Sequence, residues 1–163
     1  VMAAANNPDL QHFEYLAENA ELPQKMVEYM QEIIGPTGSI VSRHKSFENT
    51  RNKEMAALYP DKAKFLNSIS DRTIDLEDMF RDGYVDIAFG GSTSIKKVLP
   101  VIVPDLSYDK MEVANGTDAM EAFIRMIEMP KGDERQQLRN EMMDYCKLDT
   151  YAMVEIFRKM RLI

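Results

Sequence analysis

The chain has 163 residues, of which 45% are hydrophobic and 29% charged, and its formal net charge is -7. This length suits one ordinary domain with its own core, and the composition excludes disordered, collagen-like and disulfide-scaffold proteins. The single cysteine, Cys146, excludes an internal disulfide, and two histidines with one cysteine cannot form a structural zinc site. Carboxylates would therefore have to hold any metal. The net negative charge disfavours the binding of nucleic acid unless cations or a local basic patch offset this charge.

The chain contains no apolar stretch that approaches the roughly 20 residues needed to cross a bilayer. The longest strongly apolar run, residues 98–103, already contains Pro100. We therefore expect no membrane partner and a cytoplasmic location. Val1 precedes Met2 without the charged and apolar regions of a signal peptide, which suggests a piece of a longer protein.

The first part of the chain predicts two helices and a strand. The Asn7-Pro8-Asp9 segment is typical of a helix start, and the apolar residues that follow at helical spacing predict a short helix: Leu10, Phe13, Leu16 and Ala17. Pro23 opens a second helix, which Gly35-Pro36 ends. Residues 39–42 are short and β-branched, which predicts a buried strand.

The rest of the chain predicts five more helices and a second strand. The helices are expected over residues 46–58, 61–70, from Ser92 or Ser94 toward Pro100, 117–128 and about 134–161. The strand is expected over residues 73–76, and residues 83–91 predict a loop. The pattern as a whole predicts an α/β fold that is rich in helices and short of strands.

The last predicted helix carries an acid on its apolar stripe. Asp149 lies three residues after Cys146 and four before Met153, so it shares their face of the helix. Burying a lone carboxylate costs several kcal/mol unless a hydrogen bond, a cation or a metal compensates it. Tyr145 lies one turn earlier and places a phenol beside this carboxylate. Asp149 is therefore either a metal ligand or a structural residue that pairs with an arginine or caps another element.

A second candidate group, His44 to Glu48, follows the first predicted strand directly. Binding sites in α/β sheets gather where the carboxyl end of a strand turns into a helix, so Glu48 is well placed for one. The helix dipole also favours an acid in a first turn, which would give Glu48 a purely structural reason to be there.

Two further groups remain open between a functional and a structural role. The sequence from Gly90 to Lys97 combines small residues, a helix start and two lysines, which can hold a phosphate or simply form a capped helix with solvated lysines. Arg72, Asp75 and Glu77 are most simply explained by an ion pair near a strand end, with Asp75 a candidate helper ligand.

Together these segments are similar to the bacterial family catalogued as domain of unknown function 2779. The similarity is carried by Phe47-Glu48 after a strand, Arg72-x-x-Asp75-Leu76, the segment from Gly90 to Pro100, and Tyr145-Cys146-x-x-Asp149-Thr150. That family in turn resembles the DEDD exonucleases, whose ribonuclease-H-like fold uses four acids from three motifs to hold two divalent metals. The resemblance implies an α/β, ribonuclease-H-like (DEDD exonuclease-type) fold that is helix-rich and lacks the first strands of its sheet. Residues 1–163 would then be a single domain, the C-terminal part of a larger nuclease-like domain.

The resemblance also implies roles for three catalytic residues. Glu48 corresponds to the second motif, with Glu where most relatives have Asp, and Tyr145 and Asp149 correspond to the third. Glu48 and Asp149 would bind Mg²⁺ or Mn²⁺ in a two-metal site, and the Tyr145 phenol would orient the attacking water. The first motif, an Asp-x-Glu that supplies the other two acids, has no match between Val1 and Phe47.

The substrate-binding residues implied in the same way are His44, Ser94, Lys96 and Lys97. At position 44 this chain has His where the family usually has Asn, which changes the polar contact expected there.

The implied function is that of a metal-dependent nuclease, a 3'-5' exonuclease-like hydrolase acting on single-stranded DNA or RNA. We expect this sequence to be inactive alone, because two acids are too few to neutralise two metal ions. The alternative is a non-catalytic interaction module with a decayed ribonuclease-H-like site. Because a sheet without its first strands would expose apolar faces, a homodimer is one way to cover them.

Overall fold

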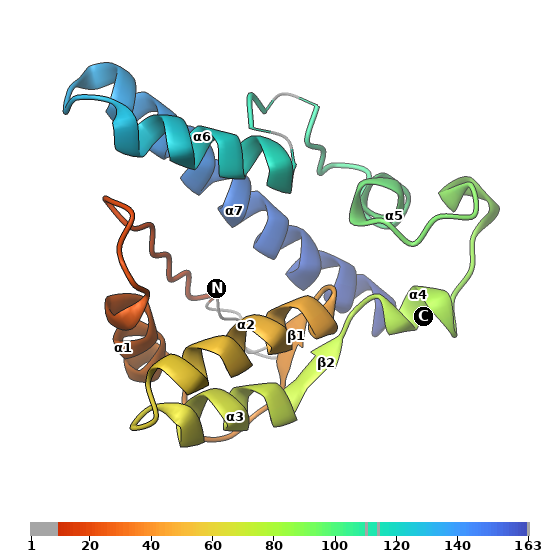
Figure 1. Cartoon of the computed structure of the whole chain (residues 1–163). Coiled ribbons are helices and arrows are strands. Elements are labelled where there is room, and N and C mark those ends of the chain that lie inside the picture. Colours follow the sequence, from red (N-terminus) through yellow and green to blue (C-terminus); the bar gives the residue numbers. More distant parts are fainter. Residues whose placement is uncertain (1–9, 110, 114, 163) are drawn as a thin grey trace. The chain divides into compact units, whose positions relative to one another are not determined.

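The structure is a computed structural model that describes residues 10–109, 111–113 and 115–162. The chain divides into two compact units (Figure 1). The central unit is Leu22–Ser94, and the terminal unit combines Val1–Glu21 with Ile95–Ile163. Each unit is described by itself below.

The central unit contains a two-stranded parallel sheet and the helices around it. Strand β1 (Ile40–Ser42) pairs with β2 (Thr73–Asp75), and Ile40 lies opposite Thr73 in the register. The helical elements of this unit are α1 (Gln24–Ile33), α2 (Lys45–Leu58), α3 (Ala63–Arg72), α4 (Asp78–Arg81) and the 3-10 helix η1 (Ile87–Phe89). The two predicted strands, the helix that Pro23 opens and the two helices between the strands are thus confirmed, although β1 is half-buried rather than buried.

The core of the central unit joins its three longer helices. One apolar side chain from each helix meets in a buried cluster: Val27 from α1, Met55 from α2 and Leu66 from α3. The connection from α1 to β1 is fixed by Arg72, whose guanidinium donates to the Gly38 carbonyl at 2.9 Å and the Gly35 carbonyl at 3.0 Å. The predicted ion pair at Arg72 is therefore wrong, because backbone carbonyls of a turn, and not a carboxylate, take up its donors.

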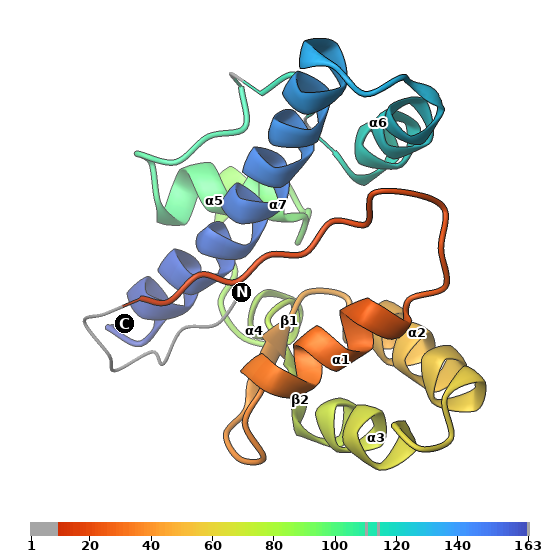
Figure 2. The same cartoon turned by 90° about the vertical axis from the view of Figure 1, so that its left-hand side faces the viewer.

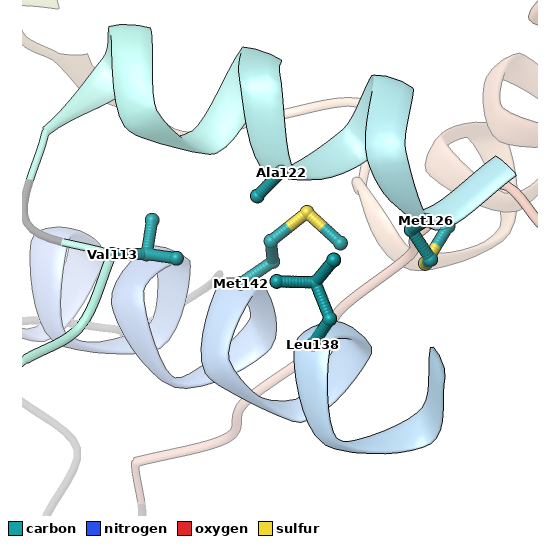
Figure 3. Close-up of a cluster of buried hydrophobic side chains, with 5 residues drawn as sticks. All are labelled: Val113, Ala122, Met126, Leu138 and Met142. Carbon is teal, nitrogen blue, oxygen red and sulfur yellow. The ribbon is translucent and has the colours of Figure 1, made fainter. Parts of the chain in front are cut away.

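The terminal unit is built on its long last helix. It contains α5 (Ile95–Ile102), α6 (Gly116–Glu128) and α7 (Asp133–Met160), and both α5 and α6 pack against α7. A buried cluster joins α6 to α7 and the segment before α6 (Figure 3): Val113, Ala122, Met126, Leu138 and Met142. All three helices confirm the sequence pattern, and α5 continues two residues beyond Pro100.

The short helix predicted near the N-terminus is wrong over its described part. Residues 10–20 contain no helix and run along α7 (Figure 2), while the expected cap at Asn7-Pro8-Asp9 lies outside the described residues. Arg139 donates to the Leu16 carbonyl at 3.3 Å, and Arg135 donates to the Glu18 carbonyl. A helix would direct such carbonyls to its own N–H groups, so an irregular segment bound by arginines replaces it.

Within the described residues, no helix combines the length and the apolar character that a membrane crossing requires.

Candidate functional site

In the central unit, polar side chains gather where β1 and β2 end. The backbone N–H of Lys45 donates to Asp75 Oδ2 at 2.8 Å, and the N–H of Glu77 donates to Asp75 Oδ1 at 3.0 Å. Asp75 thus joins the start of α2 to the turn after β2. This position accounts for Asp75 as a structural residue, because both of its oxygens already accept backbone hydrogen bonds.

Glu77 connects His44 to the loop that follows η1. Its Oε2 lies 3.0 Å from His44 Nδ1, and its Oε1 accepts a hydrogen bond from the Thr93 hydroxyl. The Glu77 side chain is 15% exposed and that of His44 is 67% exposed, so a shielded carboxylate orients a solvent-facing ring. His44 itself has a φ of 62°, which is uncommon for a residue other than glycine and is often found at functional sites.

The two remaining candidates of the central unit lie at its surface. Glu48 stands in the first turn of α2, four residues after His44, and its side chain is exposed. Ser94 is also exposed, and its N–H donates to Ser92 Oγ at 3.2 Å just before α5. The structure therefore joins the strand end, the Glu77 region and the Gly90–Ser94 loop, which the sequence presents as separate groups.

In the terminal unit, a hydrogen bond from a phenol offsets the cost of burying the Asp149 carboxylate. The Tyr108 hydroxyl donates to Asp149 Oδ1 at 2.8 Å, and Tyr108 is buried with 8% of its surface exposed. Among the described residues, no arginine or lysine pairs with Asp149. The structural-arginine interpretation of Asp149 is therefore wrong for this part of the chain. The half-buried acid is thus held by a hydroxyl group rather than by a cationic side chain of the described residues.

Tyr145 lies beside this pair on α7. The ring centroids of Tyr145 and Tyr108 are 6.3 Å apart. Burial raises the pKa of Tyr145 to about 12, and the charges of Asp149, Cys146 and Asp118 act in the same direction. The phenol is therefore neutral at physiological pH and can donate a hydrogen bond. The pKa of the neighbouring Cys146 thiol is also raised, first by burial and then by the negative charges of Asp149 and Glu14. This cysteine is therefore a poor nucleophile.

The neutral state of Tyr145 can be tested by titrating the seven tyrosines through their tyrosinate absorbance. We expect the Tyr145 phenol to titrate near 12, and Tyr145→Phe to remove this late component. Asp149→Asn should lower this pKa only in part, because burial is its larger cause. Since the unfolded chain releases this proton first as the pH rises above 10.0, the contribution of Tyr145 to stability should fall from there toward pH 12. Titration of every phenol near 10 would contradict the assignment.

The two predicted lysines lie on α5 of the terminal unit. Lys96 and Lys97 are both exposed in the first turn of this helix, so their ammonium groups are open to solvent.

The described residues do not fit a complete two-metal centre. Within them, no group of three or more His, Cys, Asp or Glu side chains is arranged to hold a metal ion. Glu48 belongs to the central unit, whereas Tyr145 and Asp149 belong to the terminal unit. The candidate residues are thus divided between the two units.

These features define a helix-rich α/β protein with a small parallel sheet. The chain belongs to the family described as a domain of unknown function (DUF2779), whose family model matches residues 2–94. No curated protein and no solved structure matches the chain. The family match confirms the family-level resemblance and includes His44 and Glu48, whereas Tyr145 and Asp149 lie beyond the matched residues.

Proposed function

We propose that the chain carries part of the site of a metal-dependent nuclease that resembles the DEDD exonucleases and hydrolyses phosphodiester bonds of single-stranded DNA or RNA. Glu48 and Asp149 are the acids of this site and Tyr145 is its water-orienting group. The 163-residue chain is inactive alone, because no Asp-x-Glu motif that would supply the other two acids stands between Val1 and Phe47.

One observation carries the proposal: Asp149 is a half-buried acid held by a phenol and by no cationic side chain in the described residues. Keeping a partly desolvated carboxylate without a counter-charge is costly, so a fold retains it where a cation compensates it. The Tyr108 hydroxyl donates to one oxygen of Asp149 and thereby fixes the position of the carboxylate. The neutral phenol of Tyr145 lies beside Tyr108, with the ring centroids 6.3 Å apart, and can orient a water molecule by donating to it.

Electron paramagnetic resonance of Mn²⁺ bound to the 163-residue chain tests whether Asp149 is a metal ligand. We expect weak binding that Asp149→Asn reduces by roughly 10-fold, because one of few carboxylate ligands is lost. Asp144→Asn, which neutralises an exposed acid on the same helix, is the matched control and should leave the Mn²⁺ affinity unchanged. Equal Mn²⁺ affinities for wild type and Asp149→Asn would count against Asp149 as a ligand.

The nuclease activity itself is tested on the protein together with any coding sequence that precedes Val1 in its reading frame. End-labelled single-stranded DNA and RNA oligonucleotides would be incubated with Mg²⁺ or Mn²⁺. We expect stepwise shortening, and a loss of roughly 100-fold or more on Asp149→Asn, since the acid holds the catalytic ion. Activity that survives this substitution would reject the proposal.

A non-catalytic interaction module is the second candidate, favoured by the lack of a three-ligand cluster in the described part of the chain. The contact between His44 and Glu77 also supports it, because a polar contact at a strand end can be purely structural. The module predicts that neither Mn²⁺ affinity nor oligonucleotide shortening depends on Asp149.

A further inference from the structure

A pocket of about 280 Å³ lies in the terminal unit between α5 and the loop that follows it. Its volume is near the lower end of the range for small-molecule sites, which suits one small ligand rather than a long chain. Its α5 side belongs to the segment from Gly90 to Pro100, whereas its loop residues belong to no sequence motif described above: Ser107, Tyr108, Asp109 and Met111.

One side of the pocket is apolar. Leu99 and Pro100 from α5 and Met111 from the following loop line it, and Leu99 is fully buried. The Tyr108 side chain adds an aromatic wall. Three apolar side chains and an aromatic ring favour a flat, uncharged group, since such a group loses little on leaving water and gains close contact.

The remaining lining is polar and carries both signs of charge. Lys96 offers an ammonium group, and Ser107 and Asp109 offer oxygen acceptors. A ligand that satisfies this set needs an anionic group for the lysine and a hydrogen-bond donor for the carboxylate.

The pocket lies one side chain away from the candidate acid of this unit. Tyr108 lines the pocket, and its hydroxyl donates to Asp149 Oδ1 at 2.8 Å. A group seated against Tyr108 would therefore stand next to the residue that positions Asp149.

We infer that this pocket binds one nucleotide unit, with its phosphate on Lys96 and its base against Leu99, Pro100 and Met111. Asp109 accepts from an amino or hydroxyl group of the nucleotide. This inference rests on the proposed nuclease function and deepens it, because it names the part of the terminal unit that receives a nucleotide of the substrate.

The test titrates the full 163-residue chain with adenosine 5'-monophosphate, without metal, and follows the change by NMR or calorimetry. Lys96→Gln should weaken binding roughly 10-fold, because one charge-assisted contact to the phosphate is lost. Lys131→Gln is the matched control, since Lys131 is also an exposed lysine of the terminal unit but does not line the pocket. Adenosine and inorganic phosphate should each bind more weakly than the nucleotide.

Three outcomes would overturn the inference. The two lysine variants lose nucleotide affinity equally, inorganic phosphate binds as well as the nucleotide, or the nucleotide does not bind at all. Thermal unfolding of both variants checks that these exposed substitutions leave the fold intact. Nucleotide binding that fails while Mn²⁺ affinity still depends on Asp149 removes only the pocket assignment. Nucleotide binding that persists while Mn²⁺ affinity ignores Asp149 removes the nuclease and leaves a nucleotide-binding module.

Discussion

Replacing Asp75 with alanine is expected to lower the free energy of unfolding by roughly 2 to 3 kcal/mol. The carboxylate accepts the N–H of Lys45 at 2.8 Å and that of Glu77 at 3.0 Å, and both donors lose their partner in the variant. The loss should be seen in urea unfolding and, by hydrogen exchange, as faster exchange at the first turn of α2.

Two controls separate this contact from the loss of a negative charge. Asp75→Asn retains one carbonyl oxygen, so it should lose about half of the effect of Asp75→Ala. Asp71→Ala removes an exposed acid at the end of α3 and should change stability by less than about 0.5 kcal/mol. An Asp75→Ala variant as stable as wild type would show that the two amides find other partners.

Leu66→Ala should destabilise the central unit by about 3 kcal/mol. Leu66 is fully buried in the cluster that it forms with Val27 and Met55, so the substitution leaves a cavity between three helices. Urea unfolding measures the free energy lost. Hydrogen exchange should place the loss in Leu22–Ser94, because these residues form a compact unit of their own.

Leu58→Ala is the comparison for this core substitution. Leu58 is also in the central unit but is 55% exposed, so the same chemical change should cost less than about 0.5 kcal/mol. Similar losses for Leu58→Ala and Leu66→Ala would contradict the assigned core.

Elements were predictable from sequence where the signal is local. In α1 the apolar spacing and the Gly35-Pro36 stop lie within the element itself, and the helix forms where they indicate. Residues 10–20 have a comparable apolar spacing but no helix, because their carbonyls bond to Arg135 and Arg139, more than a hundred residues away in the chain. A local pattern contains no information about partners at that separation.

The candidate site was predictable to the same extent. Side-chain type and position identified His44, Glu48, Tyr145 and Asp149 as chemically notable residues, but not the groups that hold them. Tyr108, the partner of Asp149, is 41 residues away, and no spacing links the two. Glu77 joins His44 to Thr93 only because β1 and β2 run parallel and bring their carboxyl ends to one edge.

The small number of strands in the parallel sheet affects how the protein behaves in concentrated solution. In the part of the chain that the structure describes, β1 and β2 pair with each other alone, so each keeps an outer side whose peptide groups face no neighbouring strand. Such a side is a template on which a further extended segment can dock, and the register of Ile40 with Thr73 would set its alignment. Light scattering over a range of concentrations would reveal whether copies of the chain use this template to self-associate.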